Sequence, residues 1–177
     1  MKRFILTGTP GCGKTSIIRA LELMGYSVIS EAATDVIAYE QMQGHEEPWK
    51  QKDFIDKIVT LQKQRQIQAA DISTDLQFYD RSPICTYALA IYLGFEPPSI
   101  LLQEIKRADE MQVYQRKVFF IENLGFCKPT KARRISFEES LVFEKIHDEA
   151  YAKFGYECVR IPPASQSERV NAILSAI

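Results

Sequence analysis

The sequence predicts an α/β fold in which strands of a parallel sheet alternate with helices. Short apolar runs recur along the chain, and most are followed by a longer segment whose apolar residues have helical spacing. Glycine and proline mark many of the boundaries between these segments. No linker, internal repeat or low-complexity tract interrupts the pattern, so residues 1–177 are expected to form a single domain.

The first strand–helix pair encloses the most informative stretch. Phe4-Ile5-Leu6-Thr7 is predicted to be a buried strand, and it leads into Gly8-Thr9-Pro10-Gly11-Cys12-Gly13-Lys14-Thr15, which fits the pattern G-x-x-x-x-G-K-[ST]. Beyond this loop, apolar residues at 17, 18, 21 and 24 form one helical face, which Gly25 ends. A strand, a glycine-rich loop and a helix therefore occur in the order of a phosphate-binding P-loop.

The residue types of this loop suit a triphosphate. Its glycines allow successive N–H groups to turn inward around a phosphate, and the helix N-terminus adds partial positive charge. Lys14 is the predicted cation for the β- and γ-phosphates, and the Thr15 hydroxyl is the predicted Mg²⁺ ligand. The expected contacts are Gly8, Pro10, Gly11, Cys12, Gly13, Lys14, Thr15 and Ser16. For Cys12 two interpretations stand, a thiolate favoured by Lys14 or a small residue that fills the turn.

The remaining elements are predicted from their apolar patterns. Strands are expected at residues 26–30, 76–80, 117–121 and 156–161, and helices at 32–39, 50–70, 84–93, 99–109, 136–154 and 166 to the end. Ser136-Phe137-Glu138-Glu139 is a capping box, and Ser82-Pro83 reads as an N-cap followed by the first helical position.

Four charged residues lie at the ends of predicted strands, where an open parallel sheet binds its ligands. Asp80 ends an apolar strand, which is the Walker-B arrangement for holding Mg²⁺, and Arg81 beside it supplies a phosphate-binding fork. The alternative is a structural Asp–Arg pair that caps the next helix. Glu31 either faces the same crevice or is a surface residue favoured by the helix dipole. Glu122 is a second, weaker Walker-B candidate because no arginine accompanies it.

A basic loop and a single tryptophan complete the candidate site. The segment at about 124–136 holds four cations between Lys128 and Arg134, and it precedes a helix. We expect it to act as a lid over the triphosphate, with Arg133 and Arg134 on the transferring group, the alternative being a solvated loop. Trp49 either stacks on a substrate or packs as a hinge under the following helix.

Composition excludes several other classes of protein. A net charge of −1 predicts no general attraction to nucleic acid, and no apolar run reaches the length of a membrane span. The N-terminal residues are not expected to form a signal peptide, because the apolar run at 4–6 is short and leads directly into the loop. Four cysteines without CxxC spacing and two distant histidines indicate reduced thiols and no zinc site, so a cytoplasmic protein is expected.

These motifs resemble the nucleoside and nucleotide kinase branch of P-loop proteins. More closely, the chain is similar to the small AAA-type predicted-ATPase family related to the nicotinamide-riboside kinase domain. The matching segments are Phe4 to Thr15, Ser30-Glu31-Ala32-Ala33, Phe78 to Pro83, Lys131 to Glu139 and Tyr151 to Arg169. The resemblance implies a P-loop NTPase three-layer sandwich, with a five-stranded parallel sheet and helices on both faces. It also implies Mg²⁺ and ATP, with GTP as the alternative nucleotide.

The resemblance further implies roles for single positions. Lys14 and Thr15 match the phosphate and Mg²⁺ ligands, Asp80 the Walker-B acid, Arg81 the arginine beside it, Arg133 and Arg134 the lid arginines, and Glu31 a carboxylate base of nucleoside kinases. Two departures from related P-loop proteins argue against a ring-forming AAA+ motor and against an ordinary signalling GTPase. Arg81 stands where large AAA+ motors carry a water-activating glutamate, and no N-K-x-D motif for guanine appears.

Two functional hypotheses result. The first is a Mg²⁺-dependent phosphotransferase that moves the γ-phosphoryl group of ATP to a small hydroxyl acceptor. In it, Glu31 or Asp80 orients the acceptor hydroxyl and accepts its proton, and Arg81 holds the acceptor or a phosphate. The second is an ATPase or GTP-binding switch that presents a surface to a protein or lipid partner without transfer to a metabolite. The sequence specifies neither the acceptor nor the oligomeric state.

Overall fold

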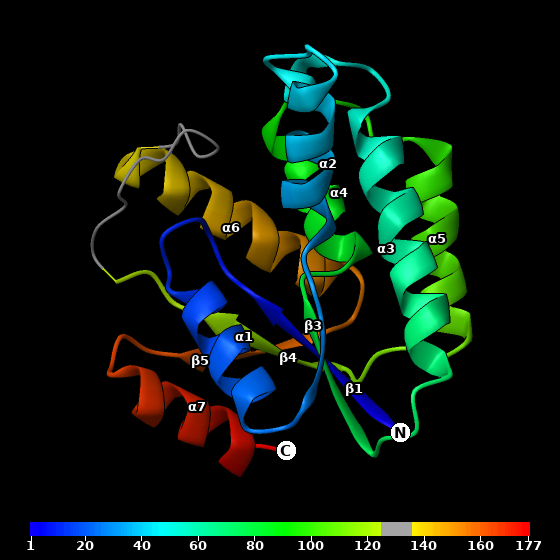
Figure 1. Cartoon of the computed structure of the whole chain (residues 1–177). Coiled ribbons are helices and arrows are strands. Elements are labelled where there is room, and N and C mark those ends of the chain that lie inside the picture. Colours follow the sequence, from blue (N-terminus) through cyan, green and yellow to red (C-terminus); the bar gives the residue numbers. More distant parts are fainter. Residues whose placement is uncertain (125–135) are drawn as a thin grey trace.

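A computed structural model describes residues 1–124 and 136–177 (Figure 1). It confirms the α/β prediction, with a five-stranded parallel sheet in the order β2-β3-β1-β4-β5. The strands are β1 (Lys2–Thr7), β2 (Ser27–Ile29), β3 (Leu76–Asp80), β4 (Lys117–Ile121) and β5 (Glu157–Ile161). The central strand β1 pairs with β3 on one side and with β4 on the other, so the loop that follows β1 lies between the ends of its two neighbours.

Helices connect the strands close to the predicted positions. They are α1 (Lys14–Leu23), α2 (Ala32–Met42), α3 (Phe54–Ala70), α4 (Pro83–Tyr92), α5 (Ser99–Glu110), α6 (Phe137–Lys153) and α7 (Gln166–Ser175). The helix predicted from residue 50 begins only at Phe54. Pro48–Lys50 forms a short 3₁₀ turn, and the extended backbone of Gln51 (ψ 143°) ends it before α3 starts.

Successive side chains of a strand point to opposite faces of the sheet, so the apolar core has two parts, one on each face. Phe4 and Leu6 of β1 pack with α1 and α7, whereas Ile5 between them packs with the helices of the opposite face. Helices α3, α4, α5 and α6 cover that second face, and α2 packs on α3 (Figure 1). The predicted arrangement of helices on both faces of the sheet is therefore confirmed.

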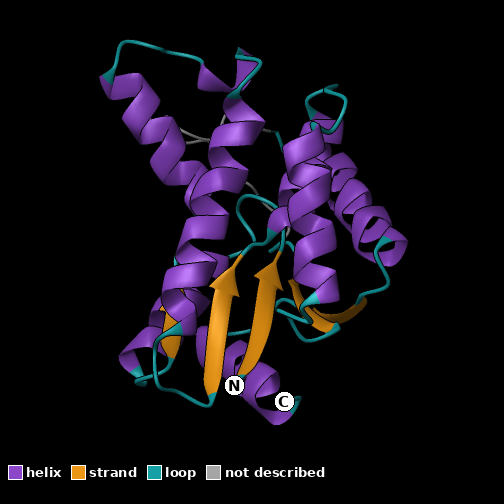
Figure 2. Cartoon of the chain, turned by 90° about the vertical axis from the view of Figure 1, so that its right-hand side faces the viewer, coloured by secondary structure: helices purple, strands orange, loops and turns teal. Residues whose placement is uncertain are grey.

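All strands point in one direction, so their carboxyl ends share one edge of the sheet (Figure 2). Three of the segments that leave this edge are the glycine-rich loop after β1, the turn from β2 into α2 and the turn from β3 into α4. These segments and the residues that border them include the predicted P-loop contacts, Glu31, Asp80 and Arg81. Among the helices that the structure describes, none is long and apolar enough to cross a membrane.

Candidate functional site

The glycine-rich loop takes a conformation that its glycines require. Gly8, Gly11 and Gly13 have φ values of 143°, 90° and 83°. A Cβ atom at Gly8 would lie 2.5 Å from the carbonyl oxygen of Ile121, so the loop passes β4 at a distance that only glycine permits. Gly13 is the N-cap of α1 and has no side chain to cap the first N–H groups, which leaves them for an anion.

The loop encloses a small cavity of about 190 Å³. Its lining consists of Thr9, Pro10, Gly11, Cys12, Gly13, Lys14, Thr15 and Ser16 from the loop and the start of α1, together with Arg81. Every predicted phosphate contact except Gly8 therefore lines this cavity, and Gly8 supports it from below through its approach to β4.

Lys14 and Asp80 form a buried ion pair at the floor of the site. The Nζ atom of Lys14 donates to the Oδ1 atom of Asp80, and their side chains are 5% and 9% exposed. Asp80 is the last residue of β3, which lies beside β1, so the sheet brings the predicted phosphate cation to the predicted magnesium acid. Thr15 lies exposed in the first turn of α1, one residue beyond Lys14.

Arg81 occupies a strained backbone position next to Asp80. Its φ of 74° is in the left-handed region, which residues other than glycine rarely adopt, while its N–H donates to the Leu6 carbonyl at 3.0 Å. The Nε atom donates to Glu31, and Nη1 donates to the Nε2 atom of His147 at 3.4 Å. Burial opposes its charge, but the Glu31 carboxylate raises the pKa of Arg81 above its ordinary value.

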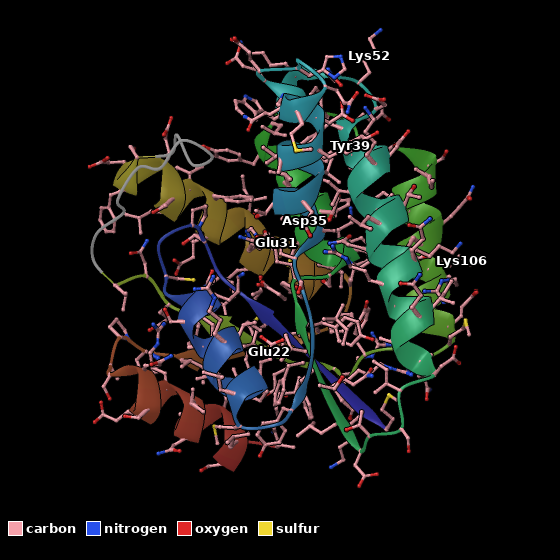
Figure 3. The ribbon with its side chains drawn as sticks, viewed as in Figure 1. Glu22, Glu31, Asp35, Tyr39, Lys52 and Lys106 are labelled. Carbon is pink, nitrogen blue, oxygen red and sulfur yellow. The ribbon has the colours of Figure 1, made fainter. Side chains whose placement is uncertain are left out.

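Glu31 faces the crevice and not the surface. It stands at the N-cap of α2 (Figure 3), yet its side chain caps no N–H group and instead accepts from Arg81 and from the Thr34 hydroxyl at 2.8 Å. Burial opposes ionisation of the carboxyl group. The charges of Arg81 and Lys14 and the hydrogen bonds outweigh that effect and lower its pKa from 4.5 to about 2.

A second cavity of about 190 Å³ opens on the other side of Arg81. It is lined by Pro10, Glu31, Ala33, Thr34, Ile37, Trp49, Phe54, Gln62, Arg81, Cys85, Thr86, Leu89, Leu93 and Phe143. Trp49 is half-buried, packs against the core and also lines this cavity. Pro10 and Arg81 line both cavities, so the two cavities are neighbours at these residues.

A buried polar cluster beneath Arg81 had no counterpart in the sequence interpretation. The Tyr151 hydroxyl lies 3.0 Å from the Ser82 hydroxyl and 3.0 Å from the Cys85 sulfur. The Nδ1 atom of His147 lies 2.9 Å from the Phe143 carbonyl oxygen, and its Nε2 atom lies 3.4 Å from Nη1 of Arg81. Ser82 was expected to cap α4 with its side chain, but no such hydrogen bond forms because its hydroxyl contacts Tyr151.

The remaining predictions concern Cys12, Glu122 and the basic loop. Cys12 is 1% exposed and packs in the core, with its sulfur against Gly8, as the filler interpretation requires. The main chain of Glu122 continues the β4–β5 pairing, since its N–H donates to Ile161. Arg133 and Arg134, and the predicted lid apart from its two ends, lie outside the described residues.

Across residues 1–124 and 136–177, no three His, Cys, Asp or Glu side chains are grouped so as to hold a metal ion by themselves. Mg²⁺ commonly takes one or two protein oxygens, together with substrate phosphates and water. The Thr15 hydroxyl and the Asp80 carboxylate fit such a donor set beside the phosphate cavity.

A P-loop on a parallel sheet of this order, with an acid at the end of the neighbouring strand, defines a P-loop nucleotide-binding protein with a kinase-like fold. A family model described as an AAA domain matches residues 3–169, and the chain therefore belongs to this family. No curated protein sequence matches the chain significantly.

Solved structures of kinases share the fold. The chain is similar to deoxyadenosine kinase from M. mycoides with dCMP and dCDP bound (TM-score 0.65, 14% identity, covering 98% of this chain and 97% of that one). The same enzyme with dCTP gives a TM-score of 0.62 at 15% identity, covering 99% and 98%. NadR protein in complex with NR gives 0.68 at 16% identity, covering 99% of this chain and 49% of that one. At these identities the likeness shows the fold alone.

Proposed function

We propose that the protein is a Mg²⁺-dependent phosphotransferase that moves the γ-phosphoryl group of ATP to the hydroxyl group of a small acceptor. The observation that supports this most strongly is that Pro10 and Arg81 line both cavities. A triphosphate in the P-loop cavity and an acceptor in the second cavity would meet there. Bringing two reactants together in this way is the largest part of what phosphoryl transfer requires.

On the donor side, the loop N–H groups and Lys14 hold the triphosphate. Lys14 pairs with Asp80, so a bound phosphate oxygen would share the Lys14 ammonium group with that carboxylate. Thr15 and Asp80 would hold Mg²⁺, whose charge balances that of the β- and γ-phosphates. Arg81, which lines both cavities, is placed to contact the phosphoryl group as it transfers.

On the acceptor side, Glu31 is ionised at neutral pH and lines the second cavity. Its low pKa makes it a weak base while Arg81 is in contact. The transition state of phosphoryl transfer is loose, however, and the acceptor proton leaves late. We therefore assign Glu31 the task of orienting the acceptor hydroxyl and receiving its proton. The mixed wall of aromatic and polar side chains suits a compact acceptor of intermediate polarity.

The fold that the chain shares with solved kinase structures agrees with a phosphotransferase. One is a deoxyadenosine kinase that binds deoxynucleotides, and another is NadR protein holding NR. The bound molecules in both are small, and neither likeness identifies the acceptor of this chain.

The deciding experiment is ADP release from Mg²⁺-ATP by the purified protein, alone and with a panel of nucleosides, nucleotides and other small hydroxyl compounds. A strong rise with one acceptor class supports the phosphotransferase. Slow release that no acceptor changes contradicts it and supports the ATPase or switch, to be followed by a search for a protein or lipid partner.

Glu31→Gln sharpens the same assay. We expect turnover with the acceptor to fall about 100-fold while the Kd for ATP stays within about twofold. The matched control is Asp35→Asn, because Asp35 is also on α2 and also pairs with an arginine, Arg65, at 2.5 Å, yet it is exposed and lines neither cavity (Figure 3). Equal turnover in the Glu31 variant and the wild type would remove Glu31 from the mechanism.

A further inference from the structure

Arg169 of α7 is a buried cation to which the proposed mechanism assigns no role. Its side chain is 3% exposed. The Nη1 atom donates to the carbonyl oxygen of Cys12 at 2.7 Å, and Nη2 donates to the carbonyl oxygen of Glu122 at 2.9 Å. Among the described residues no carboxylate lies within ion-pair distance of it, and its Nε atom is buried without a partner. Burying a guanidinium against main-chain carbonyls alone is costly, so the position calls for an explanation.

The contact with Cys12 fixes one peptide plane of the P-loop. In a trans peptide the carbonyl of one residue and the N–H of the next point in opposite directions. The Cys12 carbonyl is held toward Arg169, behind the loop, so the N–H of Gly13 is turned away from Arg169. Cys12 and Gly13 both line the phosphate cavity. The arginine thereby orients an N–H group of the loop without touching the ligand.

The packing around this contact leaves little freedom. A Cβ atom at Gly13 would lie 3.1 Å from the Arg169 Nη1 atom, which places the guanidinium directly against the loop. A second tether comes from the same helix, because the Nε2 atom of Gln166 donates to the Ser16 carbonyl at 2.6 Å. Arg169 also joins the loop to the end of β4 through Glu122. The Arg169 side chain thus connects α7, the P-loop and the residue after β4, which are far apart in the sequence.

We infer that Arg169 is a positioning residue for nucleotide binding, which presets the Cys12–Gly13 peptide of the P-loop and places a buried positive charge behind the phosphates. Lys14 contacts the phosphates from within the cavity, whereas Arg169 acts on them through the backbone and through its charge. Preorganised N–H groups need no reorientation when the ligand binds, which favours affinity. The inference depends on nucleotide binding and not on the identity of any acceptor.

The test is direct binding of Mg²⁺-ATP to the purified protein, without acceptor, measured by calorimetry. Arg169→Gln keeps a hydrogen-bond donor but removes the charge and the fork, and we expect its Kd to rise at least about tenfold. Arg169→Lys keeps the charge but reaches one carbonyl at a time, so its Kd should fall between those of Arg169→Gln and the wild type.

Val170→Ala is the matched control for a merely structural role. Val170 is the next residue of α7 and is 4% exposed in the core, so its truncation weakens helix packing without removing a contact to the loop. We expect its Kd to stay within about twofold of the wild type. An unchanged Kd in both arginine variants, or an equal loss in Val170→Ala, would overturn the inference. If Arg169→Gln does not fold, Arg169→Lys against Val170→Ala decides the question.

Discussion

At the scale of single residues, backbone geometry limits what the P-loop can tolerate. Gly8 and Gly44 both have positive φ, at 143° and 90°, but their surroundings differ. An added Cβ would collide with Ile121 main chain at Gly8 and would meet nothing within 4 Å at Gly44. A side chain at Gly44 would therefore meet backbone strain alone, whereas one at Gly8 would meet both strain and a steric clash.

Gly8→Ala is expected to lower the free energy of unfolding by at least about 3 kcal/mol and to abolish nucleotide binding, because β4 cannot move away without breaking the sheet. Gly44→Ala, which has only the strain, is expected to cost about 1 kcal/mol. Urea denaturation and ATP binding of both variants check this. Equal losses in the two would show that the approach to β4 has no role.

The Glu31–Arg81 pair has a predictable pH dependence. The folded-state pKa of Glu31, about 2, is below its ordinary value of 4.5, so its ionisation stabilises the fold above pH 4.5. This stabilisation is lost as the pH falls toward 2. Glu31→Gln should therefore cost on the order of 3 kcal/mol near neutral pH, and the difference from the wild type should shrink to less than half by about pH 3. Denaturation curves across this range measure it. A difference that does not depend on pH would contradict the lowered pKa.

At the scale of elements, α6 is fastened to the start of α4 by the buried Tyr151 hydroxyl. That hydroxyl lies 3.0 Å from Ser82 and 3.0 Å from Cys85, and the tyrosine is 0% exposed. Burial raises its pKa well above the ordinary value, so the hydroxyl stays protonated and continues to act in the network. The same two helices also touch at the surface, where Lys153 donates to the Tyr87 hydroxyl at 2.6 Å.

Tyr151→Phe is expected to lower the free energy of unfolding by about 1 to 2 kcal/mol, because it leaves buried groups without a partner. Tyr87→Phe removes one exposed contact between the same helices and should change the free energy of unfolding by less than about 0.5 kcal/mol. Thermal or urea denaturation of the two variants compares them. A larger loss for Tyr87→Phe would contradict the assigned importance of the buried cluster.

At the scale of the whole molecule, the P-loop cavity is built from both ends of the chain. Residues 8–16 line it, and α7 supports it from behind through Gln166 and Arg169. A nucleotide bound there should stabilise the folded protein as one unit. At a concentration of about 100 times its Kd, this linkage amounts to about 2.7 kcal/mol.

Mg²⁺-ATP is thus expected to raise the melting temperature of the wild type, and Lys14→Ala should remove that increase. Lys57→Ala is the control, since Lys57 also pairs with buried Glu40, at 2.9 Å, but lines neither cavity. It should destabilise the protein while leaving the ATP-dependent increase intact. Melting curves with and without nucleotide show whether the two lysines differ in this way.

Much of the fold was predictable because its signals are local. The strands at residues 76–80 and 117–121 were located to the residue from their apolar runs, and Ser136 with Glu139 forms the predicted capping box. The start of α3 was misplaced, since helical spacing begins before the extended residue Gln51 ends the preceding turn. Local pattern is weakest at such boundaries.

Some features of the candidate site were likewise predictable from local sequence, and others were not. By itself, the sequence determined the P-loop, the acid at the end of β3 and the alternation of strands and helices, because each depends on residues close together in the chain. Only the tertiary structure decided that Asp80 meets Lys14, 66 residues away, that Arg81 pairs with Glu31, and that Arg169 holds the loop from α7. Those contacts follow from which strands are neighbours and which helices cover them. Strand order is a property of the packed sheet, and no local run of residues encodes it.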